Sequence, residues 1–319
     1  MKKVFAYMFE SARQEINIHD YNKVDVINYS FGLIKEGKLS IAHLNSLKTV
    51  LDLRKKYQHL KVVLSIGGWG ADGFSDAVYS KDSRNVFIAS ILKVVNEYDL
   101  DGIDLDWEYP TFDVAKIKAR VEDKQNFTLF IQELRAKMPS KLLTIAVGAG
   151  NGIAKAIEVD VLNGYLDYLH IMTYDMGNFK NNQFSHHTNL YPSKYHSYSA
   201  SQAVEVYNKL GFDIEKIVMG IAFYGRYGLL NNQFEVARGF GYQRILELKS
   251  TMNYYFDEEA KAPIIYNDDY FVSFDDEASV TEKCKYVINN KMAGVMFWEI
   301  NSDKTGILLN TIDQVLKKG

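Results

Sequence analysis

The chain has 319 residues, of which 47% are hydrophobic and 24% are charged, as in a soluble globular protein. Its formal net charge of −3 gives no reason to expect nucleic acid or an anionic membrane as a partner. No run approaches the roughly 18 apolar residues of a membrane span, and a lone cysteine, Cys284, excludes an internal disulfide.

The first eight residues carry two lysines and then a short apolar run, which Glu10 and Arg13 interrupt soon afterwards. This run is too short for the apolar region of a signal peptide. We therefore expect a cytoplasmic protein from the chain as given, or a secreted one if a leader was removed.

Eight short runs rich in β-branched or aromatic residues predict strands, and longer segments with apolar residues three and four apart predict helices. The strands are expected at residues 4–9, 24–31, 61–67, 102–108, 142–147, 168–174, 217–223 and 294–300. The helices are expected at residues 41–57, 84–98, 123–138, 199–210, 242–250 and 278–290.

Alternating strands and helices predict a parallel sheet, and eight units favour a closed (β/α)₈ TIM barrel that forms a single domain over residues 1–319. An open doubly wound sheet would suit six or seven units. Residues 227–276 are more than one crossover needs, and we interpret them as a short insertion: one helix plus an irregular or hairpin segment. In a barrel, functional residues lie at the C-terminal ends of the strands.

The most informative segment is Asp101-Gly-Ile-Asp-Leu-Asp-Trp-Glu108. Side chains alternate across a strand, so Asp104, Asp106 and Glu108 share one face, with Cβ atoms roughly 6–7 Å apart. The opposite face is apolar and suits contact with helices, which turns the acids inward. A solvent-exposed edge strand is the alternative, but it fits a central parallel strand poorly. Crowded, buried carboxyls have raised pKa values, as a general acid near neutral pH requires.

This segment resembles the DxxDxDxE signature of family 18 glycoside hydrolases, the chitinase family, at every defined position. The resemblance extends along the chain. Further matches are the SxGG motif at residues 65–68, the MxYD motif at 172–175, the YGR turn at 224–226, and the pocket-floor tryptophan at 298. All of them fall at predicted strand ends, as the barrel rule requires.

The resemblance implies retaining, substrate-assisted cleavage of β-1,4-linked N-acetylglucosamine (GlcNAc) polymers such as chitin and chitooligosaccharides. Glu108 would protonate the glycosidic oxygen while the acetamido carbonyl of the −1 sugar attacks its own anomeric carbon. Asp106 would share a proton with Glu108 and then hold the acetamido N–H, and Asp104 would tune that exchange. Tyr174 would orient the acetamido oxygen, and Asp175 is a further candidate for contact with the distorted −1 sugar.

The resemblance also implies substrate-binding residues. Trp298 would form the floor under the −1 ring, and Ser65 would bind substrate or hydrogen-bond the aspartates. Arg226 would contact a sugar, with a structural ion pair as the alternative. Position near the barrel mouth or in the motifs adds Tyr7, Gly68, Trp69, Trp107, Tyr109, Met172 and Tyr224.

The adjacent histidines His186 and His187 raise the question of a metal, but neighbours on a loop rarely chelate together and no third ligand stands at suitable spacing. We interpret them as part of a polar loop, and expect no metal and no cofactor. The expected partner is a carbohydrate substrate bound by a monomer.

The short insertion predicts a shallow cleft and endo-type, weakly processive cutting. Two alternatives remain open. One is an endo-β-N-acetylglucosaminidase that acts on the N-glycan core or on peptidoglycan, because the motifs of the −1 site do not discriminate these substrates. The other is a non-catalytic chitin-binding lectin on the same barrel, although such relatives typically lose one of the acidic residues.

Overall fold

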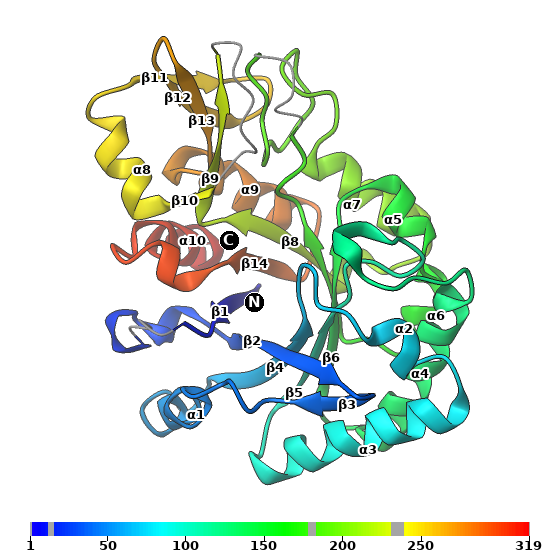
Figure 1. Ribbon diagram of the computed structural model, residues 1–319. Helices are drawn as coiled ribbons and strands as arrows, with labels where there is room; N and C mark the ends of the chain where they lie inside the picture. The colour runs from blue at the N-terminus through cyan, green and yellow to red at the C-terminus, as the bar shows by residue number, and fades with distance from the viewer. Residues whose placement is uncertain (1, 12–15, 178–182, 231–238, 319) are drawn as a thin grey trace.

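A computed structural model describes residues 2–11, 16–177, 183–230 and 239–318. Eight parallel strands form a closed barrel in the order β1-β14-β8-β7-β6-β5-β4-β2, and pairing of β2 with β1 closes it (Figure 1). Their bounds are β1 Lys3–Phe9, β2 Val26–Lys35, β4 Lys61–Gly67, β5 Gly102–Asp106, β6 Leu142–Gly148, β7 Tyr168–Met172, β8 Ile217–Ala222 and β14 Gly294–Trp298. The predicted barrel and its eight strands are confirmed. β2 runs four residues beyond its predicted end and pairs there with the short antiparallel β3 (Lys38–Ser40).

Helices cover the outside of the barrel (Figure 1). The predicted helices are present as α1 Leu47–Lys56, α3 Lys81–Glu97, α4 Asp123–Lys137, α7 Ala200–Lys209, α8 Tyr242–Lys249 and α9 Glu277–Asn289. The helices that the sequence analysis missed are α2 Phe74–Ala77, α5 Asn151–Lys155, α6 Val159–Leu162 and α10 Ile307–Lys318. Capping boxes begin two of the predicted ones, with Ser80 and Ser83 at α3 and Asp276 and Ser279 at α9.

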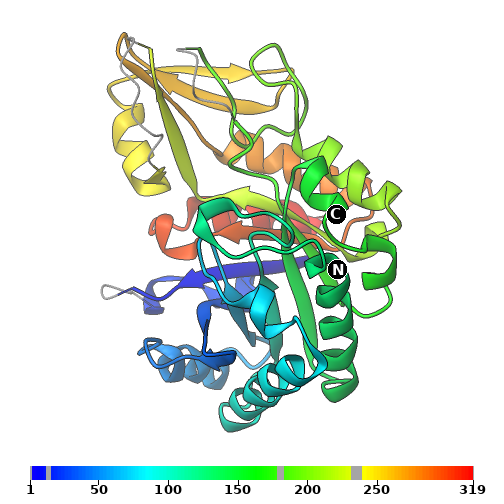
Figure 2. The same ribbon diagram turned by 45° about the vertical axis from the view of Figure 1, so that its right-hand side comes forward.

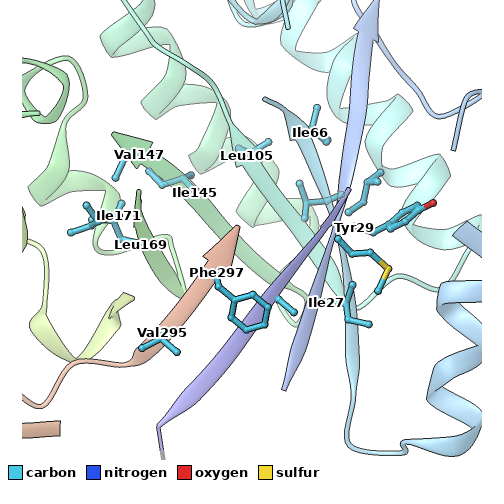
Figure 3. Packing of buried hydrophobic residues seen from close by; sticks show 14 of the residues in the cluster. Ile27, Tyr29, Ile66, Leu105, Ile145, Val147, Leu169, Ile171, Val295 and Phe297 are labelled. Atoms are coloured by element: carbon cyan, nitrogen blue, oxygen red, sulfur yellow. The ribbon is translucent and has the colours of Figure 1, made fainter. Parts of the chain in front are cut away.

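The core has two parts because each barrel strand alternates between an outer and an inner face. The outer faces pack against the helices, as Figure 3 shows for a set that includes Ile27, Ile66, Leu105, Val147, Ile171 and Phe297. The inner faces form a smaller apolar cluster that includes Phe5, Val26, Val63, Val218 and Met296. Polar side chains share this interior with the apolar cluster, and they form the site described below.

The segment between β8 and α9 is more regular than predicted. It forms a five-stranded antiparallel sheet in the order β10-β9-β13-β12-β11, which stands above the barrel strands in Figure 2. The strands are β9 Tyr224–Leu229, β10 Gly239–Gly241, β11 Asn253–Asp257, β12 Ala262–Tyr266 and β13 Tyr270–Ser273. The predicted helix is present, and of the two alternatives for the remainder the structure shows the hairpin one, extended into a five-stranded sheet. Two glycines in β9 and Pro263 in β12 hid the strands, because both residue types weaken a strand pattern.

A fully buried ion pair fastens this sheet to the barrel. Lys283 on α9 donates to both carboxylate oxygens of Asp275, at 2.8 and 2.6 Å, and to the hydroxyl of Thr188. Asp275 lies two residues beyond the end of β13 and also accepts from the backbone N–H of Ala222, the last residue of β8. The insertion sheet is therefore fixed against β8, the barrel strand that precedes it in the chain.

Candidate active site

Three carboxyl groups lie in line on the inner face of β5 and just beyond its end. Asp104, Asp106 and Glu108 retain 0%, 4% and 9% exposure. They become more accessible in that order, from the barrel interior to the cleft. Strand alternation turns their neighbours outward, where Ile103 and Leu105 pack under the helices.

Asp104 is the deepest of the three, and three hydroxyl groups surround it. Its Oδ2 accepts from Tyr7 at 2.9 Å and from Ser65 at 2.7 Å, and its Oδ1 accepts from Thr144 at 2.6 Å. These donors come from β1, β4 and β6.

The upper two carboxyls differ from Asp104 because they are buried with few donors. Burial, reinforced by the charges of Glu108 and Asp104, raises the pKa of Asp106 well above its usual range. Its Oδ1 is buried and makes no hydrogen bond within the described part of the chain. Burial also raises the pKa of Glu108 to about 7, against a hydrogen bond from Tyr109 that lowers it. Glu108 can therefore hold a proton near neutral pH.

These residues open into a cleft of about 1230 Å³ at the C-terminal ends of the barrel strands. Trp298 lies at its base, stacked on Phe31 with ring centroids 5.4 Å apart and flanked by Tyr7 and Phe9. The lining includes Asp106, Glu108, Tyr109, Gly68, Trp69, Met172, Tyr174, Asp175, Tyr224 and Arg226. Phe240 and its neighbouring glycines bring the insertion sheet into one wall. An aromatic floor with carboxyls beside it suits a sugar ring, whose C–H face is apolar and whose rim is polar.

An ion pair occupies the side of the cleft near β7 and β9. Arg226 donates to both carboxylate oxygens of Asp175, at 2.7 and 2.6 Å. Burial acts to raise the pKa of Asp175, but the hydrogen bonds and charge of Arg226 outweigh it and hold that pKa well below its usual range. Arg226 thus forms the structural ion pair that the sequence analysis gave as its alternative role. Both partners of the pair also line the cleft.

Tyr174 stands beside this pair. Its ring meets that of Tyr224 edge to face at 5.9 Å, and its hydroxyl lies 3.6 Å from the Met296 sulfur, a weak acceptor. Burial, followed by the charges of Asp106 and Glu108, raises the pKa of Tyr174 well above its usual value. The hydroxyl group is therefore protonated and can donate a hydrogen bond to a bound molecule.

The sequence as a whole matches one family model. The model for glycosyl hydrolases family 18 aligns with residues 3–303. This chain belongs to glycosyl hydrolase family 18.

Relatives and solved structures agree with this family 18 assignment. The chain is 31% identical over 283 residues to "Probable chitinase 2" of Drosophila melanogaster and 30% identical over 310 residues to "Chitinase A1" of Niallia circulans. These alignments cover 79% and 84% of this chain but only 58% and 44% of those relatives. A family 18 N-acetylglucosaminidase from Paenibacillus barengoltzii superposes with a TM-score of 0.92 at 34% identity, covering 99% of this chain and 100% of that one. The Group IV chitinase of Ostrinia furnacalis has the same TM-score and coverage at 27% identity.

Two expected substrate contacts of the family 18 hydrolase lie elsewhere. Trp107 is 3% exposed and points out of the barrel, where it stacks on Phe74 at 5.2 Å and meets Phe127 edge to face. Its side chain continues the apolar, outward face of β5. Ser65 is fully buried below the cleft, where its hydroxyl serves Asp104, the alternative that the sequence also allowed.

The histidine pair lies on an irregular connection, as predicted, but both side chains are buried. His186 and His187 are fully buried, and His186 Nε2 lies 3.0 Å from Asp257. His187 Nδ1 accepts from the backbone N–H of Asp175 at 3.3 Å, which supports that residue in its left-handed conformation at φ 56°. Within the described residues no group of three or more His, Cys, Asp or Glu side chains could hold a metal ion, and no described helix is long and apolar enough to cross a bilayer.

Among the polar residues of the site that the sequence analysis missed are Thr144, His170 and His187. The first two lie on predicted strands, and His170 has the inward parity of Met172 and Tyr174, so alternation alone could have placed it. No sequence pattern places His187, because it lies on an irregular connection.

Proposed function

We propose that this family 18 hydrolase cleaves β-1,4-linked GlcNAc oligomers, including chitin, by a retaining mechanism in which the substrate supplies the nucleophile. The observation that carries the proposal is the state of the acidic side chains that line the cleft. Apart from Glu108, each is ion-paired, hydrogen-bonded or has a raised pKa. Asp175 is paired with Arg226, and Glu10 accepts hydrogen bonds from Tyr29 and Ser46. Burial, together with the charges of Glu108 and Asp104, raises the pKa of Asp106 well above its usual range, which disfavours its anionic form.

Glu108 is therefore suited to act as an acid, while the cleft-lining carboxyls of the described residues offer no free anion as nucleophile. In the proposed first step the Glu108 proton moves to the glycosidic oxygen as the bond from that oxygen to C1 breaks. The acetamido carbonyl oxygen of the same sugar bonds to C1 and forms a cyclic oxazolinium. In the second step Glu108 takes a proton from water, and the water oxygen bonds to C1 as the bond from C1 to the acetamido oxygen breaks, which restores the acetamido group with overall retention of configuration.

The other residues assist these steps. Trp298 holds the reacting sugar against the floor of the cleft. The Tyr174 hydroxyl donates to the acetamido oxygen and keeps it below C1, which lowers the entropic part of the barrier. Asp106 shares its proton with the Glu108 carboxylate once Glu108 has protonated the glycosidic oxygen, so that Asp106 can accept the acetamido N–H and balance the positive charge of the oxazolinium. The shared proton returns to Asp106 when Glu108 takes a proton from water.

Endo-type, weakly processive cutting stays our prediction for the position of cleavage. The name of the Paenibacillus barengoltzii relative, an N-acetylglucosaminidase, makes release of single sugars a second candidate. The product pattern from GlcNAc hexamer, followed by mass spectrometry over time, separates the two. Endo-type cleavage gives dimers to tetramers from the start, whereas release of single sugars gives monomer and pentamer first.

The test of the chemistry is Glu108→Gln, which removes the transferable proton and keeps the shape of the side chain. We expect kcat on a fluorogenic chitobioside to fall by a factor of about 10³ or more, with binding of GlcNAc oligomers retained. Fully deacetylated oligomers should be inert with the wild-type enzyme, because they lack the internal nucleophile. Fast cleavage of deacetylated oligomers contradicts the mechanism, and wild-type binding without cleavage indicates a lectin. N-glycan and peptidoglycan fragments, assayed beside chitin oligomers, identify the preferred polymer.

A further inference from the structure

A buried imidazole lies directly beneath the acidic residues. His170 of β7 is fully buried in the barrel interior, and its Nδ1 lies 2.9 Å from the Tyr7 hydroxyl oxygen. The same hydroxyl lies 2.9 Å from Asp104 Oδ2. His170, Tyr7 and Asp104 therefore form a continuous hydrogen-bonded chain that leads down from the catalytic carboxyls.

The surroundings leave His170 few other interactions. Phe5 packs on its ring, with centroids 4.5 Å apart, and the residues in register on the adjacent strands are Ala146 and Val218. The ionisable groups that face it are Tyr7 and Asp104, whose Oδ1 lies 3.9 Å from Nδ1. Burial lowers the pKa of His170 to about 4, against the charge of Asp104, so that the ring is neutral at working pH.

A neutral imidazole carries one N–H, and Tyr7 has one hydroxyl hydrogen to give. If Tyr7 donates to Asp104, then the contact with His170 requires Nδ1–H as the donor and the Tyr7 oxygen as the acceptor. The opposite direction would turn the Tyr7 hydrogen toward His170 and would need a proton on Asp104. It would also bury an N–H at Nε2, an atom that has no partner within the described residues. A bare acceptor is easier to bury than an unpaired donor.

We propose that His170 is a positioning residue which, as its Nδ1–H tautomer, directs the Tyr7 hydrogen to Asp104 and so keeps Asp104 the anionic member of the aspartate pair. The shared proton then resides on Asp106, next to Glu108 and the substrate. A proton on Asp104 would weaken its oxygens as acceptors for the hydrogens of Tyr7, Ser65 and Thr144. The part played in catalysis rests on the proposed function, whereas the tautomer and the direction of the hydrogen bonds do not.

The first test is independent of activity. Nitrogen NMR of the full chain with ¹⁵N-labelled histidine, assigned by comparison with His170→Asn, reports which ring nitrogen carries the proton. We expect a protonated Nδ1 and a bare Nε2 at pH 6. The Nε2–H tautomer, or a charged ring at this pH, overturns the proposal.

The second test uses a matched pair of variants. Asparagine places an N–H donor near the position of Nδ1, whereas leucine has a similar size and no donor. In His170→Leu no N–H directs the Tyr7 hydrogen toward the Asp104 carboxylate. The acid limb of the kcat profile, where kcat falls as the pH is lowered, should therefore move to higher pH by roughly 0.5–1 pH unit. The alkaline limb, which reports Glu108, should stay in place, and His170→Asn should restore the acid limb.

Phe5→Leu serves as the packing control, because it loosens the ring contact and leaves the hydrogen-bonded chain intact. It should lower thermal stability without moving either limb. If His170→Leu lowers kcat equally at every pH, or if Phe5→Leu moves the acid limb as well, His170 has only a packing role and the proposal fails. If the wild-type enzyme cleaves no GlcNAc substrate, the proposed function fails, and the NMR measurement still decides the tautomer.

Discussion

Replacing Glu108 by glutamine should stabilise the fold at alkaline pH while it abolishes catalysis. The pKa of Glu108 rises from 4.5 to about 7 in the folded chain, chiefly through burial. Each pKa unit corresponds to about 1.4 kcal/mol, so the ionised carboxylate costs the folded state about 3 kcal/mol. The direction of the pKa shift decides how the stability changes with pH. A raised pKa favours folding below pH 4.5, and that contribution is lost as the pH rises through 7.

Glu108→Gln lacks this titration. The free energy of unfolding, measured by urea denaturation at pH 4, 6 and 8, should therefore change in favour of the variant by about 3 kcal/mol between the two ends of the range. Ser83→Ala, a substitution in the exposed α3 capping box, is a control that should shift stability equally at every pH. Parallel pH curves for the wild type and Glu108→Gln would refute the placement of a buried carboxyl group with a raised pKa in this cleft. The same titration should appear in the wild-type kcat/KM profile as an alkaline limb near pH 7.

Three further predictions concern residues around Glu108. Tyr174→Phe should lower kcat roughly 100-fold on a fluorogenic chitobioside, with KM changed little, because the acetamido oxygen loses its donor; a loss below fivefold would exclude that role. Arg226→Lys keeps the charge but cannot grip both oxygens of Asp175, so initial-rate kinetics should show KM raised about three- to tenfold; an unchanged KM would make the pair purely structural. Trp107→Phe should cost roughly 1–3 kcal/mol in urea unfolding and leave KM unchanged, whereas Trp298→Phe should raise KM. Equal KM effects would contradict their opposite orientations.

Much of the barrel could be predicted because its strands obey a simple rule. A parallel strand covered by helices must be apolar on its outer face, so the alternation in residues 102–108 fixed which way the acids point. The same rule, applied strictly, assigns Trp107 to the outside. We expected Trp107 to contact substrate because it precedes Glu108 in the sequence. In the structure its side chain points outward, as the alternation of side chains along the strand requires.

The insertion shows where sequence patterns fail. Its strands are short, antiparallel and partly exposed, so they lack the continuous apolar runs that marked the barrel strands. The contacts of Arg226 with Asp175, of His187 with the Asp175 backbone, and of Lys283 with Asp275 join segments between 8 and 51 residues apart. Such pairings follow from the closed fold, and no local spacing in the sequence encodes them.

The donors around Asp104 come from both halves of the barrel, and this has a consequence for how the enzyme matures. Tyr7, Ser65 and the three acids of residues 104–108 lie on the first four barrel strands or just beyond their ends. Thr144, Tyr174 and Trp298 lie on the last four or just beyond their ends. Neither half could hydrolyse anything alone, even if it were compact. Two separately expressed halves should gain activity only on mixing. Substrate turnover would then report whether the eight-stranded barrel has closed.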